Sequence, residues 1–224
     1  RLGLSGFRHL KRVLDQYERM GLVDLHEELS DVDDAPTIVR KVFGTAVQAI
    51  QDTQAILDYP TFERAAAVLA DAQHVVVYGL GGSAVIGQDF EHKMLRIGKF
   101  VRAHCDTHMM AMSASLLASG DVALAISHSG ASAGVVEAME LAGDAGAETI
   151  AVTNVPKSPI TRAARHVLLS ASQGSPITGE NAASRIAQLN ILDALFVRVS
   201  QTNRLEALKS LERTMGSVSR KRYT

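Results

Sequence analysis

The chain has very little cysteine: Cys105 is the single one among 224 residues. One cysteine excludes an intramolecular disulfide, and a reducing cytoplasm is the simplest location for such a chain. No run of about 18 apolar residues occurs, so we expect no membrane-spanning helix and no membrane partner. The formal net charge is only -1, which gives the chain as a whole no field that would attract a polyanion. Arg1 stands where an initiator methionine or a signal peptide would begin, so we expect the sequence to start inside a longer protein.

Charge is unevenly distributed over the first 34 residues. Residues 1–20 carry five basic and two acidic side chains, whereas residues 21–34 carry six acidic side chains and no lysine or arginine. This pattern indicates a small basic helix followed by an acidic linker that ends near Pro36. A solvated helix and loop without a further role is the simpler interpretation of the charges alone.

The spacing of apolar residues marks the expected helices and strands. Helical spacing runs through the first 72 residues, and short apolar runs then alternate with helical patterns. The expected strands are 74–78, 100–104, 122–126, 149–152 and 167–170. The expected helices are 7–20, 36–57, 62–72, 83–97, 107–118, 131–145, 158–164, 182–199 and 205–215. This alternation predicts an α/β fold, with a doubly wound, five-stranded, mainly parallel sheet between two helical layers (three-layer αβα). The pattern does not give the order of the strands.

A glycine-rich segment follows the first expected strand. This glycine loop, residues 79–83, reads Gly-Leu-Gly-Gly-Ser and opens a helix. Glycine at positions 81 and 82 lets the backbone approach a ligand closely, and the first turn of a helix presents free N–H groups that suit a phosphate. Ser83 can cap the helix and donate its hydroxyl to the same anion. Any turn from a strand to a helix favours such residues, so the loop alone does not decide between a structural and a functional role.

The glycine loop also resembles a dinucleotide-binding fingerprint. Gly79, Gly81 and Ala84 occupy the glycine positions of that pattern. An acidic residue that binds the ribose is expected about 20 residues later, and the single candidate, Asp106, follows Gly79 by 27 residues. The loop also lacks the lysine of a P-loop. A nucleotide-binding module is therefore a weaker hypothesis than a phosphate site.

A hydroxyl-rich segment follows the third expected strand. This serine loop, residues 127–132, reads Ser-His-Ser-Gly-Ala-Ser and also opens a helix. Capping a helix needs one serine, and the loop holds Ser127, Ser129 and Ser132 around Gly130, so binding is the better explanation. His128 either contacts a ligand or points into solvent. Neither loop contains lysine or arginine, and we expect hydroxyls and main-chain N–H groups to hold the phosphate.

Two further groups of residues have competing interpretations. His104, Cys105, Asp106 and His108 are close in sequence, but they lack the spacing of a known metal site, and an N-cap at position 106 or 107 is the better explanation. Glu180 precedes the expected helix 182–199. It is a candidate general base, a ligand for a sugar hydroxyl, or an acidic residue favoured by the helix dipole.

The two loops and two further segments resemble a known family. Together with 182–189, Ala-Ala-Ser-Arg-Ile-Ala-Gln-Leu, the loops resemble a SIS (sugar isomerase) domain, and residues 2–11 resemble the last part of the helix-turn-helix domain of RpiR-type bacterial regulators. Where that family often has threonine, this chain has Ser132, which keeps the hydroxyl. The resemblance implies a SIS-type fold and no catalytic or metal-binding residues. The implied ligand-binding residues are Gly81, Gly82, Ser83, Ser127, His128, Ser129, Gly130, Ser132 and Glu180. Arg185 either touches the ligand or forms a salt bridge.

The resemblance also implies a domain organisation and partners. Residues 1–22 would be the remnant of a helix-turn-helix DNA-binding domain, 23–35 a linker, 36–215 the SIS domain and 216–224 a basic tail. The implied protein is a cytoplasmic transcriptional regulator of carbohydrate metabolism that binds DNA through its N-terminal domain and a phosphorylated sugar as effector, without a cofactor. The apolar faces of the expected helices suit a homodimer or a higher homo-oligomer. A phosphosugar aldose–ketose isomerase on the same fold is the alternative.

Overall fold

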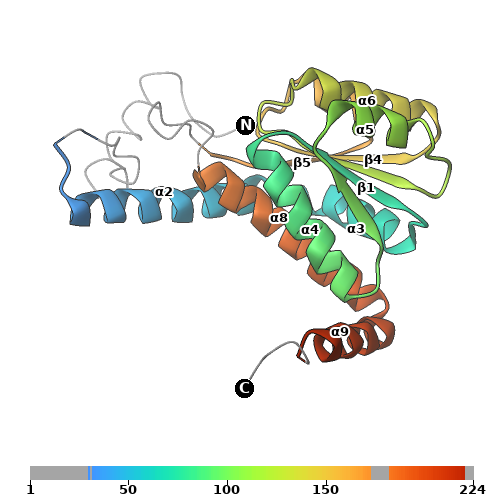
Figure 1. Cartoon of the computed structure of the whole chain (residues 1–224). Coiled ribbons are helices and arrows are strands. Elements are labelled where there is room, and N and C mark those ends of the chain that lie inside the picture. The colour runs from blue at the N-terminus through green and yellow to red at the C-terminus, as the bar shows by residue number, and fades with distance from the viewer. Residues whose placement is uncertain (1–29, 31, 173–181, 220–224) are drawn as a thin grey trace.

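The structure, a computed structural model, describes residues 30, 32–172 and 182–219 (Figure 1). Its helices are α2 (Ala35–Ile56), α3 (Tyr59–Asp71), α4 (Gly82–Arg96), α5 (Thr107–Ala114), α6 (Ala133–Asp144), α7 (Pro159–Ala163), α8 (Ala182–Thr202) and α9 (Arg204–Ser219). Its strands are β1 (Val75–Gly79), β2 (Val101–His104), β3 (Val122–Ile126), β4 (Glu148–Thr153) and β5 (His166–Leu169). The expected helix 7–20 and residues 220–224 of the expected tail lie outside the described residues.

The five strands form one sheet in the order β2-β1-β3-β4-β5. Every pairing is parallel, so the sheet is fully rather than mainly parallel. All residues of β1 and β3 are buried, as expected for parallel strands with helices on both faces. The order doubles back at β1, which lies between β2 and β3.

Alternate side chains of the central strands enter two separate cores. Val75 and Val77 of β1 pack with residues of α3, α4 and α8. Val76 and Tyr78 pack with residues of α5, α6 and α7 on the opposite face. Figure 1 shows the sheet between these two helical layers. The predicted three-layer α/β fold is confirmed.

Several helix boundaries differ from the sequence prediction. α5 ends at Ala114 rather than at 118, because Asp121 exchanges hydrogen bonds with Ala118 and turns the chain toward β3. α3 begins at Tyr59 rather than at 62, because Pro60 fits a first helical turn, where no amide donor is needed. α9 continues to Ser219, beyond the predicted end at 215.

Asp121 connects two turns at the amino end of the sheet through hydrogen bonds. Its Oδ1 accepts a hydrogen bond from His74 N at 3.2 Å and pairs with His74 Nδ1 at 2.8 Å, and its Oδ2 accepts from Ala118 N at 2.9 Å. Burial raises the pKa of the Asp121 carboxyl, but the hydrogen bonds from His74 and Ala118 outweigh burial, and the pKa is lowered overall from its ordinary 3.8.

This pKa predicts how acid affects stability. A carboxyl whose pKa is lower in the folded state stabilises the fold above its unfolded-state pKa, and this contribution is lost as the pH falls through the folded-state value. We expect Asp121→Asn to be less stable than the native chain at about pH 5 to 6, and the difference to shrink below about pH 4. Urea unfolding at several pH values measures the difference. A difference that grew toward acid pH would contradict this role of Asp121.

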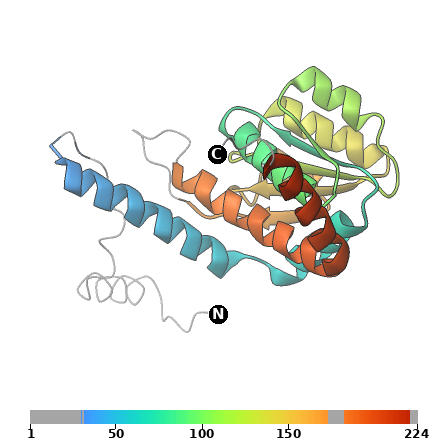
Figure 2. The ribbon, with the colours of Figure 1, turned by 60° about the horizontal axis from the view of Figure 1, so that its bottom comes forward.

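The long helix α2 lies beside α8. Ala49 of α2 packs with Ala183 and Ala187 of α8 in a small buried cluster. The N-terminal part of α2 projects beyond the sheet (Figure 2). Val39 and Phe43 are exposed there, the latter to 69%. This apolar face favours the expected homodimer, which stays a prediction.

Across the described ranges, none of the helices combines the length and the hydropathy that crossing a membrane requires.

Candidate functional site

The glycine loop and the serine loop lie next to each other at the carboxyl edge of the sheet. Gly79, the last residue of β1, is in register with Ile126, the last residue of β3. From these two strands the chain leaves toward opposite faces, because α4 packs in one core and α6 in the other. Such a point, where the strand order reverses, is where open α/β sheets bind ligands.

The glycine loop turns sharply from β1 into α4. A Cβ atom at Gly79 would lie 2.8 Å from Ser83 O, and Gly81 has φ +55°, which L residues rarely adopt. Gly81 is the N-cap of α4, so the prediction that Ser83 caps the helix is wrong. The positive φ at the cap requires glycine, and Ser83 lies instead in the first turn, with 7% of its surface exposed.

In the serine loop, the Ser127 hydroxyl shapes the backbone, and the Ser132 hydroxyl bonds to Ser127 instead of capping α6. Ser127 Oγ accepts a hydrogen bond from Gly130 N at 3.1 Å. Ser132 is the N-cap of α6, but its side chain makes no capping hydrogen bond, and its Oγ lies 3.4 Å from Ser127 Oγ. The exposed Ser129 accepts from Ala131 N at 3.3 Å. The simple capping explanation of these serines therefore fails for Ser132, because its hydroxyl is not used by the helix.

His128 connects the serine loop to α8. Its Nδ1 lies 2.6 Å from the Oγ of Ser184, and its main-chain oxygen accepts from Asn154 N at 3.1 Å. The ring is half-buried, so it does not point freely into solvent. With Nδ1 engaged, Nε2 is the ring atom that could face a ligand.

Arg185 brings a positive charge to the glycine loop from a distant part of the chain. A Cβ atom added at Gly82 would lie 3.2 Å from Arg185 Nη1 and 3.3 Å from Arg185 Cδ. Sequence reasoning left Arg185 between a ligand contact and a salt bridge, and it expected hydroxyls and main-chain N–H groups to hold the phosphate. Only the position of Arg185 in the SIS-like segment 182–189 pointed to it, since a contact across about 100 residues leaves no local signal.

The structure therefore brings eight of the predicted site residues together in the two adjoining loops. They are Gly81, Gly82, Ser83, Ser127, His128, Ser129, Gly130 and Ser132. The ninth, Glu180, lies outside the described residues.

The segment 104–108, His-Cys-Asp-Thr-His, has a structural role at Asp106. Asp106 is the N-cap of α5, and its Oδ1 accepts from Met109 N at 3.0 Å, as predicted. This use of the carboxylate also weakens the dinucleotide hypothesis, which needs Asp106 for a ribose.

His104 stacks on Tyr78, with ring centroids 6.4 Å apart. Burial, followed by the charge of Arg102, lowers the pKa of His104, and burial raises the pKa of Tyr78 to about 12. Among the described residues, no three His, Cys, Asp or Glu side chains gather as a metal site would require.

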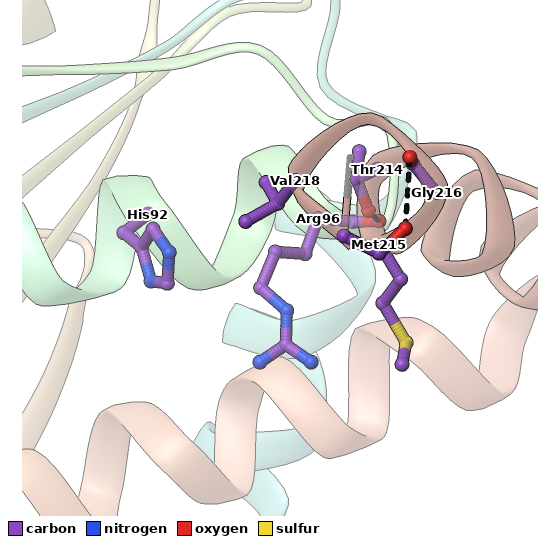
Figure 3. Close-up of a pocket in the computed structure, with 7 residues that line it drawn as sticks. His92, Arg96, Thr214, Met215, Gly216 and Val218 are labelled. Atoms are coloured by element: carbon purple, nitrogen blue, oxygen red, sulfur yellow. Dashed lines mark hydrogen bonds between the residues drawn. The ribbon is translucent and has the colours of Figure 1, made fainter. Parts of the chain in front are cut away.

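A separate cleft of about 580 Å³ lies where α9 crosses α4 (Figure 3). His92 and Arg96 line it from α4, and Met215 and Val218 line it from α9. Arg96 ends α4, and the 15 residues of that helix separate it from the glycine loop by roughly 20 Å. This cleft is therefore distinct from the candidate site.

Comparisons with known proteins agree with this geometry. A family model described as SIS domain matches residues 68–198, more than half of the chain. The HTH-type transcriptional regulator RpiR of Escherichia coli (strain K12) is 41% identical over 214 residues, which cover 95% of this chain and 72% of that protein. The chain belongs to the RpiR-type transcriptional regulators with a SIS domain. The family resemblance expected from the sequence is thus confirmed.

Two solved structures are similar in fold to this RpiR-type chain. The NanR protein of Vibrio vulnificus, complexed with ManNAc-6P, has a TM-score of 0.79 and 25% identity, and the match covers 99% of this chain and 78% of that one. Phosphoheptose isomerase GmhA from Neisseria gonorrhoeae has a TM-score of 0.66 and 22% identity, with 75% and 100% covered. The likeness to the isomerase shows the fold alone.

Proposed function

We propose that the glycine loop and the serine loop bind the phosphate group of a phosphorylated sugar, and that this sugar is the effector of a regulator of carbohydrate metabolism. The observation that carries the proposal is the hydroxyl of Ser132, which sits at the start of α6 without capping it, beside Ser127 and Ser129. Hydroxyls and free first-turn N–H groups form the donor set that holds a phosphate. The likeness to NanR, whose structure contains ManNAc-6P, supports a phosphosugar.

The proposed contacts extend over both loops. Main-chain N–H groups of Gly81, Gly82 and Gly130 and the hydroxyls of the serines would hold the phosphate. His128 and Glu180 would contact the sugar part of the ligand. The proposed DNA contact lies in the N-terminal segment 1–22, as part of a helix-turn-helix domain, and the proposed assembly is a homodimer. The isomerase alternative needs a general base. Its candidate, Glu180, lies outside the described residues, and the RpiR relative favours the regulator.

Replacing Ser132 with alanine is expected to weaken phosphosugar binding by ~10- to 100-fold, because a hydrogen bond to a charged group contributes about 1.5–3 kcal/mol. Calorimetric titration with a panel of pentose, hexose and N-acetylhexosamine phosphates measures the affinity. The control is Ser217→Ala on α9, where Ser217 Oγ donates to Thr214 O far from the loops. If no phosphosugar of the panel bound the native chain, or if Ser132→Ala bound with unchanged affinity, the proposed site would be wrong.

A further inference from the structure

Arg185 occupies an electrostatically unfavourable position. It lies in the first turn of α8, and its side chain packs against Gly82, the first residue of α4. The N-terminal ends of both helices carry partial positive charge, which favours anions and disfavours cations. The guanidinium thus stands where two positive helix ends meet. The interaction with the helix dipoles therefore does not explain an arginine there.

No ion pair within the described ranges compensates this charge. Arg198, on the same helix, pairs with Glu63 at 2.9 Å, whereas no carboxylate of the described residues pairs with Arg185. The residues three and four positions away on α8 and before it are Asn181, Ala182, Gln188 and Leu189, so its own helix offers no acidic neighbour either. Arg185 is exposed beside the glycine loop with its donors available.

A second polar group on α8 also lacks a partner. Gln188 is only 1% exposed, yet its Nε2 has no hydrogen-bond partner in the described part of the chain. It follows Ser184 by four residues, so both lie on the same face of α8, and Ser184 contacts His128 of the serine loop. Buried amide donors are normally satisfied. Among the described residues, α8 thus holds an unpaired cation and an unpaired buried donor one turn apart, and both have hydrogen-bond donors available for a further group.

We propose that Arg185 binds the phosphate of the effector and thereby joins the first turn of α8 to both loops. This inference rests on the proposed function and adds a binding residue to it. The phosphate placed at the glycine loop neutralises the charge that Arg185 brings to two positive helix ends. Arginine suits this role because its planar fork binds two phosphate oxygens at once. The neighbouring Ser184 already ties the same turn to the serine loop, so an anion held by Arg185 joins α8 to both loops.

The test compares Arg185→Gln with Arg185→Lys and with the matched control Arg198→Gln on the same helix. For phosphosugar and for inorganic phosphate, we expect Arg185→Gln to weaken binding by ~10- to 100-fold in calorimetric titrations, and Arg185→Lys to recover part of the loss. Arg198→Gln keeps the native affinity. Without any anion, Arg185→Gln raises the melting temperature, because the repulsion at the two helix ends is removed. A merely structural arginine would lower it.

The outcomes separate this inference from the proposed function. If Ser132→Ala loses phosphosugar binding while Arg185→Gln keeps the native affinity, the role of Arg185 is wrong and the loop site stands. If Arg185→Gln lowers the melting temperature without ligand and leaves phosphate binding intact, the residue is structural. If the native chain binds neither phosphosugar nor inorganic phosphate, both proposals are overturned.

Discussion

Replacing Gly130 with alanine is expected to lower the free energy of unfolding by about 2–4 kcal/mol and to abolish phosphosugar binding. Gly130 has φ +63°, and a Cβ atom there would lie 2.2 Å from the Oγ of Ser158 and 2.6 Å from its Cβ. Ser158 cannot easily move aside, since it is buried and its Oγ donates to Val155 O at 2.9 Å. The backbone must therefore shift, and the serine loop that it shapes moves with it.

Chemical unfolding and calorimetric titration measure the two effects of Gly130→Ala. Gly44→Ala is the matched control, because Gly44 lies inside α2 with nothing within 4 Å of an added Cβ. There, alanine is expected to stabilise the helix by about 0.5–1 kcal/mol. In the double variant Gly130→Ala with Ser158→Ala, only the 2.2 Å clash with the hydroxyl is relieved, whereas the 2.6 Å clash with the Cβ at position 158 and the cost of the positive φ remain. Native stability and native affinity in Gly130→Ala would show that the loop does not depend on this contact.

Local patterns were sufficient to predict the elements that carry the site. The run Val122–Ile126 is apolar throughout and forms β3 over the predicted residues, because a strand buried on both faces needs no alternation. The serine loop was found because it holds more hydroxyls than capping needs. The cap of α4 was predicted wrongly, since the sequence shows that Ser83 is a good capping residue but not that the chain enters α4 with positive φ at Gly81.

Contacts between distant segments could not be predicted in the same way. The strand order depends on which strands pair across the sheet. The contact of Arg185 with Gly82 and the hydrogen bond between His128 and Ser184 depend on how α8 lies across the sheet. Spacing along the chain reports which face of a helix is apolar, but it does not report which loop that face meets. The sequence therefore named Arg185 as either a ligand contact or a salt-bridge residue, but its place beside the glycine loop could not be predicted.

The contact between α8 and α2 is expected to be sensitive to side-chain size. Ala187 is fully buried and packs with Ala49 of α2. A leucine at position 187 would force the two helices apart, and overpacking of this kind costs about 1–3 kcal/mol. We expect Ala187→Leu to lose that much stability, and amide hydrogen exchange to become faster along α2 than in the strands. Ala194→Leu is the control, because Ala194 is exposed on the same helix.

The contact between α8 and α2 also connects the candidate site with α2. The first turn of α8 touches both loops through Ser184 and Arg185, and Ala183 and Ala187 on the same helix touch α2, whose N-terminal part projects beyond the sheet (Figure 2). A saturating phosphosugar is therefore expected to slow hydrogen exchange along α2 in the native chain. In Ala187→Leu, phosphosugar still binds through the loops but no longer protects α2. If α2 in that variant were protected as in the native chain, the effect of the ligand would reach α2 by a route other than the alanine contact.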